Sequence, residues 1–466
     1  MTKFIHLTDN LQNPKRVEGN KSVEDVLKIA SIGQLKNHPD LLIFPDSFSE
    51  SSRSIYDLSI VNAKNLQYSD SGKYASVDVT TGNLMGFVGI NDTSLSIHSR
   101  FTHSRKGSNG DEYDQDFFLY YMLQKILSIN VFSLDHANNQ DNKILDFLLF
   151  LFPSMLKKAM SQGLYKEYKT LQHDDAQVHG VININRVIRN DIPFHGRISY
   201  STRQHSYDNS ITQLVRHTIE YIKHHPFGAS ILSNDQETKE CVSQIISSTP
   251  SYNGRERERV LKQNLKPKVH PYFLKYRDLQ QLCVRILRHE SLKYGKEENK
   301  VYGILFDGAW LWEEYLNTIL KDLNFKHPKN KESKGGVRMF EKPSDEDYFD
   351  NNSRRMYPDF YRKDRKDYIL DAKYKHLNGN VGREDLYQVV SYMYCMDAPL
   401  GGYVYPDDGH NILKKYKLAG KGTQYPDNEG GVISVIPFQV PQNSEDWNSF
   451  ATAMKLSEER LATSIL

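Results

Sequence analysis

Alternating apolar and polar positions dominate the first hundred residues of the chain. Residues 73–79, 84–90 and 95–101 show this two-residue period, and short polar turns separate them. Such alternation is typical of half-buried strands in an antiparallel meander. An amphipathic helix is expected ahead of the strands, at residues 23–35. We therefore predict a β-rich N-terminal domain over residues 1–105.

Helical periodicity governs the middle of the chain, residues 106–298, although a β-like interlude occurs at residues 176–188 and 196–208. The longest apolar run, residues 144–156, is shorter than the ~18 residues of a membrane span. It contains an aspartate and a proline and predicts a buried helix. The helices expected in this mainly helical middle domain cover residues 116–132, 143–168, 210–225 and 279–292.

The last third of the chain, residues 299–466, mixes both periods. One helix, consecutive strands, a second helix and further strands are typical of a mixed α/β domain. The chain is thus predicted to be a multidomain α+β protein whose C-terminal α/β domain has a mixed central sheet. Helices are expected at residues 303–323 and 384–396, and strands at 335–341, 355–362, 368–375, 400–406 and 430–440.

The overall charge does not announce a polyanion partner, because 60 Lys and Arg face 58 Asp and Glu in the 466 residues. A local basic stretch with interleaved aromatic residues lies at residues 255–277. Such clusters contact phosphates, and aromatic rings stack on bases. A solvated face or a partner interface explains the stretch equally well. The candidate DNA contacts are Arg255, Arg257, Arg259, Lys262, Lys266 and Lys268.

The three cysteines are widely separated and form no CxxC pair. This argues against a disulfide framework and against a zinc site. The N-terminus lacks the apolar segment of a signal peptide. A cytoplasmic location is therefore expected.

Residues 356–375 contain charged groups where a half-buried hairpin would rather place apolar ones. Period-two alternation sets Asp371 and Lys373 on one face of the second strand. The short turn at residues 363–367 favours an antiparallel hairpin, so Asp359 can approach Asp371 across the pair, while the turn points into solvent. The D/E-x-K pattern alone decides nothing, because it recurs at residues 141–143, 167–169, 298–300 and 364–366.

Two neighbouring carboxylates repel each other unless a cation or a proton lies between them. Mg²⁺ takes such oxygen ligands and keeps several waters, and the carbonyl of Ala372 is a candidate third ligand. Lys373, beside a water activated by the ion, can orient it or stabilise charge on a phosphoryl oxygen. The same residues also fit an ordinary hairpin with solvated charges.

Two flanking helices favour the metal-site interpretation. In the helix expected at residues 303–323, Glu313 lies at the edge of the apolar arc, whereas Glu314 is expected to point away into solvent. In the helix expected at residues 384–396, Gln388 and Tyr392 form an i, i+4 pair. Both helices flank the hairpin in the chain and can place polar groups beside it.

The order of these motifs resembles the PD-(D/E)xK nuclease core, in the variant whose following helix carries QxxxY. The matching motifs are Glu313, Pro358-Asp359, Asp371-Ala372-Lys373 and Gln388-x3-Tyr392. More specifically, residues 150–400 are similar to the McrC family, the nuclease subunits of McrBC-type restriction systems, including their LlaJI-type relatives. Residues 82–101 resemble the β-rich N-terminal part of the same family. Only the nuclease motif is specific; the rest is a similarity of pattern.

This resemblance implies a Mg²⁺-dependent DNA endonuclease subunit, with Mn²⁺ as a substitute ion. Asp359 and Asp371 would hold the metal, Lys373 would be the catalytic lysine, and Glu313 the auxiliary acid, although its neighbour Glu314 could take that role instead. Gln388 and Tyr392 would be the supporting pair on the helix. The family also implies a ring-forming McrB-like AAA+ GTPase as partner, whose GTP hydrolysis the chain stimulates, and residues 1–105 are the candidate docking domain.

The chain shows no nucleotide site of its own. Residues 418–424 resemble the end of a P-loop, but Lys415 stands where the motif requires its first glycine. GTP would therefore be used by the partner. Two alternatives to the DNA nuclease stay open: a non-catalytic adaptor that activates a nucleotide-driven ring, and a nuclease of the same fold that cuts another nucleic acid such as RNA.

Overall fold

The computed structural model describes two compact units, one formed by Met1–Asp135 with Glu298–Leu466 and the other by His136–Glu297. The predicted domains 1–105, 106–298 and 299–466 therefore do not correspond one to one to these units. The structure describes residues 3–32, 41–44, 59–70, 72–91, 93–102, 105–106, 112–113, 116–127, 143–225, 228–233, 235–267, 270–294, 301–328, 336–339, 355–362, 368–377, 381–419, 431–442, 444 and 446–465.

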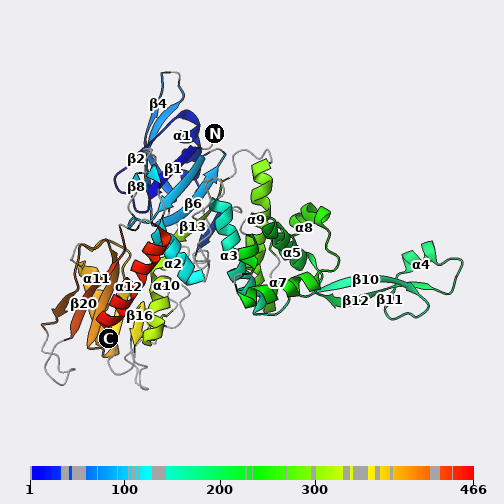
Figure 1. The fold of residues 1–466 in the computed structure, drawn as a ribbon. Coiled ribbons are helices and arrows are strands. Elements are labelled where there is room, and N and C mark those ends of the chain that lie inside the picture. The colour runs from blue at the N-terminus through cyan, green and yellow to red at the C-terminus, as the bar shows by residue number, and fades with distance from the viewer. Residues whose placement is uncertain are drawn as a thin grey trace, which may run out of the picture. The chain divides into compact units, whose positions relative to one another are not determined.

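The first unit contains a five-stranded sheet to which both of its chain segments contribute strands (Figure 1). β1 is parallel to β7, β6 lies antiparallel between β7 and β13, and β13 is parallel to β3. β13 thus inserts a late segment of the chain beside strands from the beginning. The strands in sheet order are β1 (Lys3–Thr8), β7 (Thr93–His98), β6 (Leu84–Ile90), β13 (Val301–Asp307) and β3 (Leu41–Phe44).

The pairing of β6 with β13 depends on a glycine. Gly86 has a φ of +131°, and a Cβ there would lie 2.2 Å from the carbonyl oxygen of Ile304. Only glycine allows the two backbones to approach this closely.

A smaller sheet and a helix share one hydrophobic core with the five-stranded sheet. α1 buries Val23, Val26 and Ile29 against strands of both sheets. The smaller sheet has the order β2-β5-β4, and both of its pairs are antiparallel. These elements are β2 (Lys15–Glu18), β5 (Tyr74–Thr81), β4 (Val61–Tyr68) and α1 (Asn20–Ala30).

The second five-stranded sheet of this unit is mixed and carries the hairpin. β17, β18 and β20 are parallel, and the edge strands β16 and β19 are antiparallel to their neighbours. Its middle strands are buried almost throughout, as expected for parallel strands covered on both faces. The strands in sheet order are β16 (Phe360–Arg362), β17 (Tyr368–Ala372), β18 (Leu400–Asp407), β20 (Val432–Gln439) and β19 (Lys414–Lys417).

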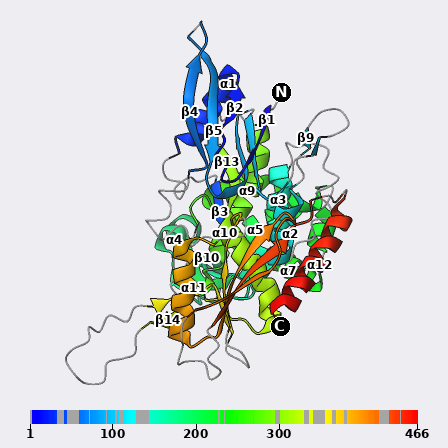
Figure 2. The same ribbon diagram turned by 90° about the vertical axis from the view of Figure 1, so that its left-hand side faces the viewer.

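Helices cover both faces of this mixed sheet, and alternate residues of the strands face each side. α11 (Arg383–Met396) packs Val389 and Met393 against one face. On the other face, the Trp312 ring of α10 (Gly308–Leu320) meets Phe438, and α12 (Trp447–Ile465) contacts β20. Figure 2 shows α11 and α12 on opposite sides of the strands.

The remaining described elements of the first unit are a buried helix, α2 (Phe117–Leu127), which packs against α10 and α12, and several short pieces. The short pieces are β8 (Arg105–Lys106), β9 (Glu112–Tyr113), a 3-10 turn (Lys321–Leu323), β14 (Val337–Arg338) and β15 (Arg355–Met356).

The second unit is a helical body with a projecting β arm (Figure 1). The arm consists of β10 (Glu167–Asp175), β11 (Val181–Ile182), α4 (Ile184–Asn190) and β12 (Ile198–Ser206), in which β12 pairs antiparallel with both other strands. The body comprises α3 (Lys143–Met160), α5 (Ser210–Lys223), α6 (Gly228–Leu232), α7 (Gln236–Ser248), α8 (Arg257–Gln263), α9 (Tyr276–Tyr294) and two 3-10 turns (Gly254–Glu256 and Pro271–Phe273).

The structure confirms the strands predicted at residues 73–79 and 84–90, shifts the strand predicted at 95–101 to Thr93–His98, and corrects two helix predictions. The helix expected from residue 303 begins only at Gly308, because residues 301–307 are the buried strand β13 and Asp307 caps the helix by accepting a bond from the Ala309 amide. The helix expected over 143–168 ends at Met160, and its last residues belong to β10. The apolar run of β13 and the polar segment of β10 each pair with another strand that periodicity alone does not reveal.

The apolar run at residues 144–156 lies in α3, where Leu149, Leu151 and Phe152 are fully buried. Within the ranges that the structure describes, none of the helices has the length and apolarity needed to cross a membrane.

Candidate active site

The hairpin expected at residues 356–375 brings its two aspartates together. β16 pairs antiparallel with β17 so that Phe360 lies opposite Leu370. One step further in this register, Asp359 lies opposite Asp371. The Asp359 carboxylate is oriented by the amide of Ala372, which donates a hydrogen bond of 2.8 Å to Oδ2. The turn at residues 363–367 lies outside the described residues.

Both aspartates are held where an ionised carboxylate is unfavourable. Asp371 is only 1% exposed on β17, and its burial, with the charge of Asp359, raises its pKa to about 7. Burial and the charge of Glu313 raise the pKa of Asp359 to about 7 as well. A hydrogen bond from Ala372 and the charge of Lys373 oppose the rise at Asp359 without cancelling it. A bound cation would offset the cost of burying the two carboxylate charges and would reduce the repulsion between them.

Lys373 lies at the centre of the polar contacts. Its Nζ is 2.7 Å from Asp371 Oδ2 and 3.1 Å from Asp385 Oδ1. It also donates a long hydrogen bond of 3.5 Å to Gln388 Oε1. Burial lowers the pKa of Lys373, but the two carboxylates outweigh it and hold the pKa above the usual value. The side chain is therefore an ammonium group fixed beside Asp371.

Gln388 and Tyr392 lie on the face of α11 that is turned towards the hairpin. Gln388 Nε2 donates to the hydroxyl of Tyr392 at 2.9 Å, as their i, i+4 spacing predicts. The hydroxyl of Tyr392 lies 3.5 Å from the carbonyl oxygen of Tyr357, just before Asp359. The pair thus links Lys373, directly after β17, to the backbone that leads into β16.

A histidine that the sequence did not single out supports Asp359 from behind. His327 Nδ1 donates 2.7 Å to the carbonyl oxygen of Asp359, and its ring stacks on Phe360 with centroids 4.7 Å apart. Its Nε2 lies 3.7 Å from Glu314 Oε1. The expectation that Glu314 is merely solvated is therefore wrong, because this carboxylate reaches the site through His327.

The roles of the two glutamates differ in the structure. The charge of Glu313 acts on Asp359, which places it near the carboxylate pair. Burial lowers the pKa of His327, but Glu314 and the Asp359 carbonyl raise it above the usual value.

Two residues of the site were not predicted, and no spacing rule points to the first of them, His327, in the sequence. Asp385, by contrast, lies one helical turn before Gln388, and an i, i+3 search from Gln388 would have found it.

The donor set suits an ion that keeps its own waters. Across the described ranges, no group of three or more His, Cys, Asp or Glu side chains forms a complete metal cage. Mg²⁺ is commonly held by one or two carboxylates with water completing its shell, and Asp359 and Asp371 supply that number. The residues present therefore fit a Mg²⁺-type site, and the contribution of the Ala372 carbonyl stays a prediction.

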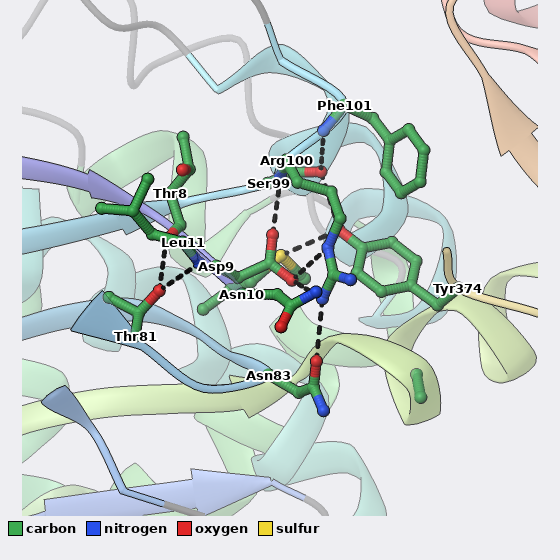
Figure 3. A network of polar contacts seen from close by, with 12 residues as sticks. Thr8, Asp9, Asn10, Leu11, Thr81, Asn83, Ser99, Arg100, Phe101 and Tyr374 are labelled. Carbon is green, nitrogen blue, oxygen red and sulfur yellow. Dashed lines mark hydrogen bonds and ion pairs between the residues drawn. The ribbon is translucent and has the colours of Figure 1, made fainter. Parts of the chain in front are cut away.

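A buried junction ties the end of β17 to the N-terminal sheet (Figure 3). The hydroxyl of Tyr374, directly after Lys373, lies 2.7 Å from Ser99 Oγ. The guanidinium of Arg100 lies over the Tyr374 ring, 5.0 Å from its centroid. The Asp9 carboxylate accepts hydrogen bonds from the backbone amide and from Nε of Arg100. The strand that carries Asp371 and Lys373 is thereby anchored in a second layer of the same unit.

The basic stretch of the second unit is only partly available to a ligand. Arg255, Lys262 and Lys266 are exposed. Arg257 instead donates to the carbonyl of Leu287 at 2.9 Å, and Arg259 forms an ion pair with Glu256. Lys268 lies outside the described residues. Arg255, Lys262 and Lys266 therefore remain the better candidates for DNA contacts.

Exposed apolar side chains gather on the arm of the second unit. In the described part of residues 1–105, the predicted docking domain, Tyr68 is the one large apolar side chain that is mostly exposed. A free surface rarely keeps such a cluster, so the arm is a candidate docking surface. Its exposed apolar residues include Val181, Ile182, Ile184, Ile188, Ile192 and Phe194.

Comparison with known proteins identifies a family. The model of the McrBC 5-methylcytosine restriction system component matches residues 79–406, which include every predicted residue of the hairpin site. No curated protein matches the chain.

Two solved structures are similar to the chain at low identity. One is a refined half-complex from a tetradecameric assembly of Thermococcus gammatolerans McrB AAA+ hexamers with bound McrC; it is 13% identical with a TM-score of 0.49, over 97% of this chain and 100% of that one. The other is the cryo-EM structure of the Thermococcus gammatolerans McrBC complex, 13% identical with a TM-score of 0.34, over 68% of this chain and 87% of that one.

Proposed function

Because the chain belongs to the McrBC 5-methylcytosine restriction system component family, we propose that it is the DNA endonuclease subunit of such a system. The observation that carries this proposal is the convergence of Asp359, Asp371 and Lys373 on a mixed sheet, with Gln388 on the adjacent helix. A PD-(D/E)xK-type nuclease domain accounts for these residues and for their order along the chain.

In this proposal, Asp359 and Asp371 hold Mg²⁺, for which Mn²⁺ substitutes. When bound, the ion supplies positive charge for the scissile phosphate and makes water a better nucleophile. The Ala372 amide fixes the rotation of the Asp359 carboxylate, and His327 fixes its backbone. The ammonium of Lys373 stabilises the negative charge that develops on the phosphoryl oxygens during attack. Glu313 is the auxiliary acid beside this pair.

The proposed reaction is hydrolysis of phosphodiester bonds in double-stranded DNA. The partner is an McrB-like AAA+ GTPase, which consumes GTP and whose hydrolysis this chain stimulates. The exposed apolar side chains of the arm support a partner-dependent protein, since a partner surface would remove them from water. Exposed Arg255, Lys262 and Lys266 supply candidate phosphate contacts.

The test compares cleavage by the wild type with cleavage by Asp359→Asn, Asp371→Asn and Lys373→Met, each with partner, GTP and Mg²⁺. Every variant is expected to lose about 10³-fold in cleavage rate, because each removes charge from the reacting centre. Glu384→Gln is the matched control, since Glu384 is an exposed acid on α11 and should leave cleavage unchanged.

Partner binding separates the proposal from its alternatives. The three site variants should still bind the partner and stimulate GTP hydrolysis. An adaptor without nuclease activity would stimulate GTP hydrolysis, while neither the wild type nor any variant would cut DNA. Cleavage of a matched RNA in preference to DNA would show that the chain is a nuclease of the same fold that acts on RNA.

A further inference from the structure

Asp385 bridges two lysines at the edge of the candidate active site. It lies in the first turn of α11, and its Oδ1 is 3.1 Å from Lys373 Nζ. Its Oδ2 is 2.6 Å from Lys375 Nζ. The side chain is 17% exposed, so solvent screens this contact with Lys373 only in part. Asp385 therefore competes directly with Asp371 for the ammonium of Lys373.

The position of Asp385 is set by the sheet and not by the lysines alone. The hydroxyl of Tyr403 donates 2.6 Å to the Asp385 carbonyl oxygen. Tyr403 is fully buried on β18, where it pairs in register with Asp371. The same tyrosine thus relates the backbone of Asp385 to the strand position of Asp371. A carboxylate fixed in this way can hold Lys373 in a constant place.

The contacts of Lys373 create a conflict at Asp371. Lys373 Nζ is 2.7 Å from Asp371 Oδ2, so the ammonium occupies an oxygen of a carboxylate that should also bind a divalent ion. Two cations on one carboxylate repel each other, and each weakens the binding of the other. A second anionic partner weakens the pairing of the ammonium with Asp371, so that an Asp371 oxygen can bind the ion. Asp385 is that second partner.

We propose that Asp385 is a positioning residue that holds Lys373 beside Asp371 while leaving the Asp371 carboxylate available to the metal ion. The inference rests on the proposed nuclease function and deepens it. Without the charge of Asp385, Lys373 would pair fully with Asp371 and would oppose metal binding. The role of Asp385 is therefore visible in metal affinity as well as in cleavage.

The test measures Mn²⁺ binding to the full-length protein by titration calorimetry, without DNA and without partner. Asp385→Asn should weaken Mn²⁺ binding about tenfold, since it removes one charge-assisted contact of Lys373. In the Lys373→Met background, the same change should have little effect, because no ammonium remains to compete. This non-additivity distinguishes a contact through Lys373 from a general loss of negative charge.

Two outcomes would overturn the inference: equal Mn²⁺ affinity in Asp385→Asn and wild type, or an equal effect of Asp385→Asn with and without Lys373. Glu384→Gln, which removes a neighbouring exposed acid, is the charge control and should leave the affinity unchanged. Thermal unfolding of each variant checks the fold. If Asp385→Asn does not fold, Lys373→Met alone still tests the inference. It should bind Mn²⁺ at least as tightly as the wild type, and weaker binding would contradict the competition between Lys373 and the ion.

Cleavage gives a second measurement. At saturating Mn²⁺, Asp385→Asn should still cut DNA about tenfold more slowly than the wild type, because the ion then takes Asp371 from Lys373 and no second carboxylate holds the ammonium at the reacting centre. Asp385→Glu should recover part of this loss. If the wild type binds no Mn²⁺ and cuts no DNA, the nuclease proposal itself fails. If the wild type does both and Asp385→Asn matches it in both, only the role of Asp385 is wrong.

Discussion

Most proteins expose charged side chains and bury apolar ones. The hairpin site departs from this rule by burying a charged side chain, and the arm of the second unit departs from it by exposing apolar ones. The hairpin keeps Asp371 only 1% exposed, whereas the arm leaves Ile184 and Phe194 each 68% exposed. Buried charge and exposed apolar surface both reduce the stability of an isolated chain. The comparison agrees with the two proposals: a bound cation would offset the cost of burial at the hairpin, and a bound macromolecular partner would cover the apolar side chains of the arm.

Apart from the loss of cleavage expected of the hairpin variants, the largest effect is expected from a change that disrupts the arm and leaves the hairpin intact. Ile184→Asp combined with Phe194→Asp should weaken partner binding about 100-fold, because both changes place charge in the centre of an apolar contact surface. DNA cleavage should fall with it at limiting partner concentration. Titration of labelled partner measures the loss. Ile412→Asp is the matched control, since Ile412 is 75% exposed in the other unit; equal binding by the double variant and this control would contradict the assignment of the arm.

The next effect concerns the stability of the metal-free hairpin. The pKa of Asp359 is about 7 in the folded protein, above the value of 3.8 for an unperturbed aspartate. Its carboxyl therefore destabilises the fold increasingly as pH rises from about 4 to about 7, where the unfolded chain is already ionised. Asp359→Asn should stabilise the metal-free protein by about 2 kcal/mol at pH 8 and by almost nothing at pH 4.

Denaturant unfolding in the presence of a chelator, at pH 4 and at pH 8, measures this difference. Added Mg²⁺ should reverse its sign at pH 8, because the ion binds only the wild type and stabilises it. A constant stability difference across the pH range would mean that the Asp359 carboxyl is not held in an unfavourable place.

The smallest effect tests the junction behind the hairpin. Tyr374→Phe removes the hydroxyl that contacts Ser99 and keeps the ring under Arg100, so it should destabilise the first unit by about 1 kcal/mol. Cleavage should fall only a few-fold, since the charged groups remain in place. Thermal unfolding and cleavage assays measure both. Tyr387→Phe, at a tyrosine 64% exposed on α11, should change neither quantity.

Much of the hairpin site could be predicted from local patterns. The alternation in residues 368–375 sets Asp371 and Lys373 on one side of β17, and a short turn limits the register in which Asp359 can pair. The i, i+4 spacing likewise predicts the contact between Gln388 and Tyr392. These relations follow from the geometry of one strand, one hairpin or one helix, so the residue pattern contains them.

Other features could not be predicted from the sequence, because they depend on contacts between segments that are far apart in the chain. The apolar residues of β13 match a buried helix as well as a strand, and only the approach of β6 to its backbone decides between them. The contact of His327 with the Asp359 carbonyl joins segments that no common period relates. The same holds for Ser99 and Tyr374, which are joined across the junction although 275 residues separate them.

The sequence by itself determined the two aspartates, the lysine and the helix pair as one candidate site, because backbone periodicity and a known motif order suffice to assemble neighbours. Only the tertiary structure decided that Asp385 shares Lys373 with Asp371 and that Glu314 reaches Asp359 through His327. Only the structure placed β13 in the N-terminal sheet. The physical reason is common to all three: each contact depends on how separate elements pack, and packing depends on side-chain shape and burial that no local period encodes.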